Sequence, residues 1–370
     1  MKLLEKILVP IDINIDSKEQ INTAIKIAKL SDSEIFILYV LPEEGLKGAI
    51  KDLVFSSATK ALDKIKNVFV KEGITVCEPV IKYGKPVDKI LKMAAKEDVN
   101  LILTGSGSKK EEKKIKRGYT AEKLMRQSKK PVWVVKSDKA NKLKNILCPV
   151  DFSEHSKCAL KTAILLSKFF NARLTILGVY EEYANYSPRF TMDIETENAH
   201  RLKQFEREME EFIKEFDLIG INHNIEIEAG SAHVEILKTI EENDHDLLVM
   251  GTHGRSGIKK FVIGSVTEKV TREVPCSFIT TKTEIETHYK IANDLFKNGH
   301  YNDAIGQYLI CLQINGMHIP SLFKLSETFR IIDDSAKAKY YGDMANDVLT
   351  KLWDDGIAKD IKKYYTSGNQ

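Results

Sequence analysis

The residues best suited to chemistry lie in one short stretch of the second half of the chain. Gly251 and Gly254 are separated by two residues, and nine more lead to Gly264 and Ser265. Residues 246–250 before this stretch are mostly apolar and read as a strand, and the residues from Ser265 onward have the pattern of a helix. Glycine lets backbone N–H groups approach an anion closely, and the first turn of a helix offers N–H groups without a partner. The order of strand, glycine-rich loop and helix therefore favours phosphate binding.

The chain carries much of this arrangement twice. Residues 6–12, KILVPID, return as residues 145–151, NILCPVD, so that Asp12 and Asp151 correspond at an offset of 139 residues. Two further segments return at an offset of 146 residues, 83–91 as 229–237 and 100–105 as 246–251. Two copies of roughly 140 residues have the size of ordinary domains, so the sequence predicts a tandem duplication and not a solenoid.

Each copy alternates short apolar runs with helical periods, which predicts a five-stranded parallel sheet covered by helices on both faces. In the second copy we expect strands at about 145–151, 172–180, 221–229, 245–251 and 276–281. The helices between them are expected at about 154–170, 193–218, 231–243 and 264–274. Ligands of such sheets bind beyond the carboxyl ends of the strands. Asp151, Val179 and Gly251 all fall at strand ends, so we expect them to converge on one crevice.

The glycine spacing resembles the nucleotide-binding pattern of the universal stress protein family, and the resemblance covers about residues 1–282. It implies two tandem Rossmann-like domains of the adenine nucleotide alpha hydrolase type, at 1–138 and 144–282, with ATP bound in the second, with or without Mg²⁺ or Mn²⁺. The residues that it implies for the nucleotide are Pro149, Val150, Asp151, Val179, Met250, Gly251, Gly254, Arg255, Gly264, Ser265, Val266 and Thr267.

The resemblance also implies a role for several of these residues. Asp151 corresponds to the carboxylate on the ribose or adenine side, and Val179 and Met250 to the residues beside the base. Ser265 and Val266 lie where N–H and hydroxyl groups meet phosphate oxygens. Arg255 either neutralises phosphate charge or faces solvent; the sequence leaves both readings open.

The first copy departs from this pattern. It keeps Asp12, Gly105 and Gly118, but Ser108 and Tyr119 stand where the second copy has its middle glycine and its serine. A serine in left-handed backbone costs on the order of 1–2 kcal/mol. Tyr119 puts a ring where the start of the helix would receive phosphate, so we expect the first site to be degenerate.

No catalytic constellation accompanies the loop. The chain lacks the G-x-x-x-x-G-K-[ST] pattern whose lysine reaches the γ-phosphate. We expect Ser153 to cap the helix that follows Asp151, with Glu154 and His155 exposed in its first turn. No catalytic residue and no metal site are predicted. Three functions remain open: an ATP-binding regulator of the stress response, an interaction scaffold that needs no nucleotide, and a slow ATPase.

Beyond Lys282 the strand pattern stops. Ala292, Gly299, Tyr301, Ala304 and Tyr308 have the spacing of small and aromatic residues that resembles a tetratricopeptide repeat, a helical hairpin of about 34 residues. A weaker copy follows, and residues 353–365 have the pattern of a capping helix. The sequence predicts an all-α extension at 284–370 that contacts a protein partner or a second subunit.

Composition and charge limit the remaining choices. The 56 basic and 53 acidic residues leave a net charge of +3, which excludes a general attraction to nucleic acid or membrane. The five cysteines are scattered, which favours thiols in a reducing compartment. No segment reads as a membrane span or signal peptide. We therefore expect a cytoplasmic protein. The last strands, at 131–135 and 276–280, are apolar edges that need cover, so we expect the copies to pack about a pseudo-twofold axis. We also expect the chain to form a homodimer.

Overall fold

The computed structural model describes residues 4–43, 48–107, 119–136, 143–182, 194–252, 264–282, 285–314 and 316–354. The chain divides into two compact units. One contains both repeats, up to Lys282, and the other contains the helices from Ile285 onward.

The described residues of the first repeat alternate strands and helices. They form β1 (Lys6–Pro10), α1 (Lys18–Ser31), β2 (Glu34–Leu41), α2 (Gly48–Lys71), β3 (Val80–Tyr83), α3 (Pro86–Lys96), β4 (Leu101–Gly105), α4 (Tyr119–Gln127) and β5 (Val132–Val135). Side chains at the inner positions of β1, β2 and β4 are mostly buried on both faces of the sheet, as expected for strands that carry helices on both faces.

The second repeat follows the same order. It forms β6 (Asn145–Val150), α5 (Glu154–Phe170), β7 (Arg173–Tyr180), α6 (Ile194–Ile213), β8 (His223–Ala229), α7 (Ala232–Glu242), β9 (Leu247–Gly251), α8 (Ser265–Glu273) and β10 (Ser277–Thr281). The predicted bounds of α5 are confirmed at both ends. Its C-cap Asn171 has φ 49°, and the corresponding C-cap of α1, Asp32, has φ 51°. Asn and Asp tolerate this left-handed conformation better than most residues, so the helix end was preserved in both copies.

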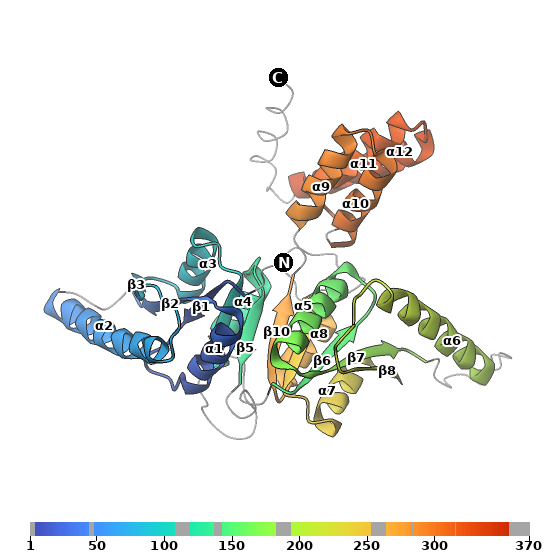
Figure 1. The fold of residues 1–370 in the computed structure, drawn as a ribbon. Coiled ribbons are helices and arrows are strands. Elements are labelled where there is room, and N and C mark those ends of the chain that lie inside the picture. Colours follow the sequence, from blue (N-terminus) through green and yellow to red (C-terminus); the bar gives the residue numbers. More distant parts are fainter. Residues whose placement is uncertain are drawn as a thin grey trace. The chain divides into compact units, whose positions relative to one another are not determined.

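The strands of the two repeats join into one sheet in the order β3-β2-β1-β4-β5-β10-β9-β6-β7-β8. Within each repeat the five strands run parallel, as predicted, but the two sets form one ten-stranded sheet and not two separate ones. Figure 1 shows β5 and β10 side by side where the repeats meet, and they pair antiparallel, with Phe278 opposite Val134 and Ile279 opposite Trp133. The prediction that the last strands cover each other is confirmed, and the cover is a shared hydrogen-bonded ladder.

Basic side chains cross the junction between the repeats in a symmetric manner. Lys136, which follows β5, donates from Nζ to the carbonyl of Val274 at the end of α8. Lys282, which follows β10, donates from Nζ to the carbonyl of Arg126 in α4 at 2.6 Å. An ammonium group suits the negative carboxyl end of a helix. The Arg126 Nη2 also donates to Glu268 Oε1 at 3.1 Å, so α4 and α8 are tied directly.

The second unit is all helical, as predicted. It consists of α9 (Ile285–Lys297), α10 (Tyr301–Ile314), α11 (Ile319–Ile331) and α12 (Ser335–Asp354). Ala292, Ala304 and Tyr308 lie in its core, and the Tyr308 hydroxyl donates to Asn293 Oδ1 at 2.7 Å. Gly299 turns the chain between α9 and α10 with φ 78°. Trp353 belongs to the last turn of α12. The predicted capping helix from residue 355 onward lies outside the described residues. The tetratricopeptide character of this unit stays a prediction.

Two observations bear on the environment of the chain. In the parts that the structure describes, no helix combines the length and the apolar character that crossing a bilayer requires. Cys148, Cys276 and Cys311 are buried.

The half-buried Lys282 gives the stability of the fold a specific pH dependence. Burial lowers the pKa of Lys282 from 10.5 to about 8. Between these values the unfolded chain binds more protons than the folded one, so folding becomes more favourable as the pH rises through this window. Lys282→Met removes this titration. We expect the stability of the variant relative to the parent to fall by on the order of 2 kcal/mol between pH 7 and pH 10.5.

Urea unfolding at several pH values measures this difference. Lys269→Met, at an exposed position of α8, is the control for the general loss of a lysine. A difference between Lys282→Met and the parent that stays constant with pH would contradict the prediction.

Candidate functional site

The strand ends of the second repeat converge as the sequence predicted. β6 lies between β7 and β9 in the sheet, and Val150 at its end pairs with Gly178. Asp151 follows β6, Val179 lies at the end of β7, and Gly251 ends β9. Three segments spread over about a hundred residues therefore meet at one edge of the sheet.

Asp151 is held by the first turn of the helix that follows it. Its Oδ1 accepts hydrogen bonds from the hydroxyl of Ser153 at 2.6 Å and from the backbone N–H of Ser153 at 3.1 Å. The Ser153 hydroxyl oxygen accepts in turn from the N–H of Ser156 at 3.2 Å, which confirms the predicted cap of α5. The cap thus also fixes the orientation of the carboxylate at the strand end.

The expectation that His155 is exposed is wrong, because the first turn of α5 packs on β9. His155 is 3% exposed. A Cβ placed on Gly251 would lie 2.9 Å from the Cβ of His155 and 3.0 Å from its carbonyl carbon and oxygen. Gly251 is therefore required by the close approach of helix and strand, whether or not a ligand binds there.

The start of α8 lies beside this glycine, and among the described residues no side chain caps it. The N–H of Gly264 donates to the carbonyl of Thr252 at 2.8 Å, and α8 begins at the exposed Ser265 with no side-chain cap from the described residues. Thr267 is buried and donates to the Gly251 carbonyl at 2.9 Å. Thr267 thus ties the helix to the strand end, while the N–H groups of the first turn remain suited to an anion.

The other predicted residues fall into three groups. Val150 and Met250 are buried in the core, so they offer backbone groups to the crevice, whereas Pro149, Val179 and Val266 are half-buried. Gly254 and Arg255 lie outside the described residues. Within the described ranges, no three His, Cys, Asp or Glu side chains gather as metal ligands.

Gly178, which lets α6 lie against β7, was not predicted from the sequence. A Cβ there would lie 2.4 Å from Met209 Cε and 2.6 Å from Phe205 Cε1. The Phe205 ring lies 5.0 Å from the ring of Phe152, the residue after Asp151. The first repeat has Tyr39 at the position of Gly178, by the offset of 139 residues. This difference between the repeats is the signal in the sequence that could have indicated the role of Gly178.

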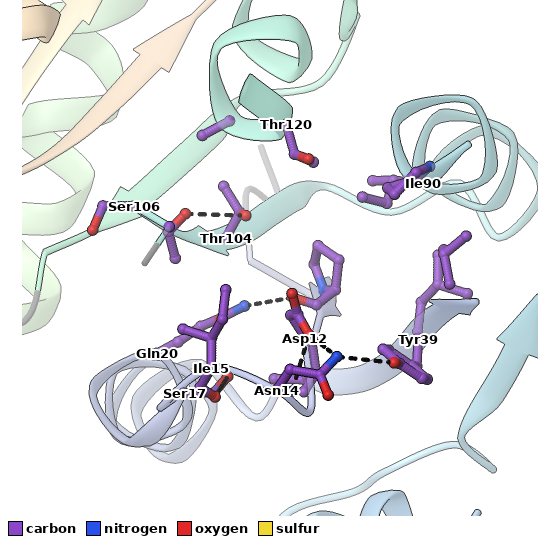
Figure 2. A pocket seen from close by; sticks show the side chains of 18 of the residues that line it. Asp12, Asn14, Ile15, Ser17, Gln20, Tyr39, Ile90, Thr104, Ser106 and Thr120 are labelled. Atoms are coloured by element: carbon purple, nitrogen blue, oxygen red, sulfur yellow. Dashed lines mark hydrogen bonds between the residues drawn. The ribbon is translucent and has the colours of Figure 1, made fainter. Parts of the chain in front are cut away.

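The corresponding edge of the first repeat is hollow. A cavity of about 810 Å³ opens there, and its polar lining includes Asp12, Asn14, Gln20, Tyr39 and Thr104. Figure 2 shows Asp12, Asn14 and Tyr39 close together, with Thr120 and Ile90 on the other side of the hollow. The Asn14 Nδ2 donates to Asp12 Oδ1 at 3.0 Å and to the Tyr39 hydroxyl oxygen at 3.4 Å.

Tyr119 begins α4 and lines this cavity. The residue is 71% exposed, and the Nζ of Lys123 lies 4.2 Å from the centroid of its ring. Whether the ring competes with a phosphate at the start of α4 stays a prediction. Ser108, the other reason for expecting a degenerate site, lies outside the described residues, so the degeneracy toward nucleotide stays a prediction.

The two glycines that end β4 and β9 should respond differently to substitution. At Gly105 a Cβ would meet only the Oε1 of Gln20, at 3.3 Å, the end of a side chain. At Gly251 it would meet the backbone of α5. We expect Gly251→Ala to lower the free energy of unfolding by on the order of 1–3 kcal/mol, because the overlap forces α5 and β9 apart. Gly105→Ala should stay within about 1 kcal/mol of the parent. Urea unfolding measures both, and equal losses would contradict the prediction.

Comparison with known proteins gives the same family for both repeats. The model of the universal stress protein family matches residues 4–136 and again residues 142–282. A protein of Staphylococcus aureus strain USA300 named for this family is 32% identical over 149 residues, which cover 38% of this chain and 85% of the relative.

A solved structure shows the same likeness over both repeats. A universal stress protein from Archaeoglobus fulgidus is 26% identical, with a TM-score of 0.58, and the match covers 75% of this chain and 98% of that chain. Another universal stress protein, solved in complex with cAMP, is 22% identical with a TM-score of 0.28 and covers 37% of this chain and 95% of that chain. With both repeats matched by the family model, the chain belongs to the universal stress protein family and carries two copies of the family's domain in tandem.

Proposed function

We propose that the chain is an ATP-binding regulatory protein of the stress response, and that its second repeat holds the nucleotide. The observation that carries this proposal is the start of α8. Its first turn has no side-chain cap among the described residues and lies beside the end of β9, next to the strand that leads to Asp151. A helix start in this position favours a phosphate group through its N–H donors and its partial positive charge.

The residues present fit such a ligand. Phosphate oxygens would accept from the N–H groups of Ser265 and Val266 and from the Ser265 hydroxyl. Asp151, fixed by Ser153, would accept from a ribose hydroxyl or the base. Val179 and the backbone of Met250 would lie beside the base. Thr267 acts through Gly251, since its hydroxyl is bonded to that carbonyl. Gly254 and Arg255 belong to the proposal on their spacing alone.

A titration of the purified chain with ATP tests the proposal. We expect one ATP per chain. Asp151→Asn should weaken binding at least tenfold, because a hydrogen bond to a charged acceptor contributes about 1.5–3 kcal/mol. Asp12→Asn, the matched change in the first repeat, should leave ATP affinity within twofold. Calorimetry gives stoichiometry and affinity together.

The contrary outcomes point to different functions. Two equal sites, or an equal loss in Asp12→Asn, would refute the assignment to the second repeat. No binding at millimolar ATP would favour the interaction scaffold. Release of phosphate over hours from the bound complex would indicate the slow ATPase.

We further propose that the helical unit serves protein contact and has no part in nucleotide binding. Its signature residues Ala292, Ala304 and Tyr308 are used to pack its helices together. Ile291, Phe323 and Ile331 are large apolar residues that remain exposed. In this proposal a protein partner buries these side chains. The pairing of β5 with β10 within the chain leaves neither strand free to pair with a second subunit. We therefore assign homodimer formation to the helical unit as well.

Deletion of residues 284–370 tests this division. We expect ATP affinity within a few-fold of the parent, since no residue of the proposed site is removed. The oligomeric mass in light scattering should fall. Loss of ATP binding in a truncation that keeps its circular dichroism spectrum would contradict the proposal, and so would an unchanged mass.

A further inference from the structure

The helix α2 keeps more large apolar side chains exposed than any other described helix. It has five of them, whereas only three of its 24 residues are buried. Five exposed residues follow one another at intervals of three, seven, four and four, namely Ile50, Leu53, Lys60, Lys64 and Val68. These intervals keep them on one face of the helix. The face has apolar side chains at both ends and lysines between them, and covering the apolar side chains would be favourable.

The equivalent helix of the second repeat, α6, has the opposite charge. α2 contains five lysines and two aspartates, which gives a net charge of +3. α6 contains six glutamates, two arginines and one lysine, which gives a net charge of −3. The segments 44–47 and 183–193, which precede these helices outside the described residues, each contain one acidic and one basic residue. They therefore leave the contrast between the two helices unchanged.

Each helix also carries two like charges one turn apart on its exposed side. They are Lys60 and Lys64 on α2, and Glu206 and Glu210 on α6. Like charges at this spacing repel each other and weaken a helix. In the described part of the chain, none of these four side chains has an ion-pair partner of opposite charge. A second surface of opposite charge would relieve the repulsion on either helix.

The two helices lie on the same face of the sheet, near its two ends. α2 leads to β3 and α6 leads to β8, and these are the outermost strands of the sheet. Leu62 of α2 and Phe212 of α6 belong to the one hydrophobic core on that face. Figure 1 shows α2 and α6 at opposite ends of the sheet. A second copy, turned over about an axis parallel to the strands, would therefore place its α6 over α2 and its α2 over α6.

We propose that two copies of this chain associate through these helices, with α2 of each copy against α6 of the other. Opposite charges attract across the contact and fix which helix meets which. The twofold axis forms the contact twice. An axis at right angles to the strands would instead bring α2 onto α2 and α6 onto α6, which the like charges oppose. This contact goes beyond nucleotide binding and is separate from the one proposed for the helical unit.

The main competing partner of α2 is an anionic lipid surface. Lysines beside exposed apolar side chains on a helix are suited to lipid headgroups as well. A lipid surface would engage α2 alone and would be repelled by the acidic α6. Charge reversal on α6 consequently separates the two partners.

Light scattering of the full chain at two ionic strengths tests the contact. At low salt the parent should have at least 1.5 times the average mass that it has at about 1 M salt, where charges are screened beyond roughly 3 Å. Lys60→Glu with Lys64→Glu should show the high-salt mass under both conditions, and so should Glu206→Lys with Glu210→Lys. An equimolar mixture of the two double variants should recover the low-salt mass of the parent. The chain with all four changes should recover it as well, because α2 is then acidic and α6 basic.

The helix α3 offers a matched control. Lys92 and Lys96 are exposed and one turn apart, like the pair on α2, but α3 packs on the other face of the sheet. Lys92→Glu with Lys96→Glu should therefore keep the mass of the parent at both ionic strengths. Circular dichroism verifies that each variant is folded.

Several results would overturn this inference. A parent mass that does not change with salt would remove the contact, and so would an equal loss of mass in the α3 control. Folded double variants whose mixture fails to associate would show that α2 and α6 do not meet. Binding of the parent to phosphatidylserine vesicles that is lost on charge reversal of α2, with no effect of the α6 variant on the mass, would assign α2 to a lipid surface. Association that persists at high salt in every variant belongs to the helical unit, so the two contacts fail separately.

Discussion

The antiparallel pairing of β5 with β10 is the contact on which the arrangement of the two repeats depends. Each repeat alone would end in an apolar edge strand, and an uncovered edge invites pairing with another chain. Because the two last strands run in opposite directions, the five strands of one repeat point opposite to those of the other. The carboxyl ends of the strands of one repeat therefore lie at the opposite end of the continuous sheet, along the strand direction, from those of the other repeat. The two candidate sites are separated in the same way.

This separation determines how the sites could influence each other. Ligands at opposite edges cannot touch, so any coupling must pass through the protein between them. The described connection is the junction itself, where Lys136 and Lys282 reach the helix ends of the other repeat and Arg126 bonds to Glu268. Both α4 and α8 begin at a candidate site and end at this junction. A shift of either helix along its axis would change these hydrogen bonds directly.

Duplication has kept the backbone and changed the side chains around the strand ends. Asp12 and Asp151 are alike, but the first accepts from an asparagine and the second from the serine that caps a helix. Where the first repeat has Tyr39, the second has Gly178 beneath Phe205. The first edge is consequently open and lined by acceptors, whereas the second is shaped by an aromatic cluster and by the close approach of α5.

Sequence patterns predicted the local elements and the convergence of the strand ends, but not the individual side-chain contacts between distant segments. Periodicity located the strands and both ends of α5, because each depends on residues close in the chain. The burial of His155 depends on β9, almost a hundred residues later, and the bridge made by Gln20 reaches Leu103 across 83 residues. Neither contact leaves a trace in local spacing. Gly251 shows the ambiguity best. Its spacing pointed to a phosphate loop, yet the packing of α5 would require glycine there even without a ligand. Its presence therefore supports the fold more strongly than the site, and the donors at the start of α8 carry the greater weight for nucleotide binding.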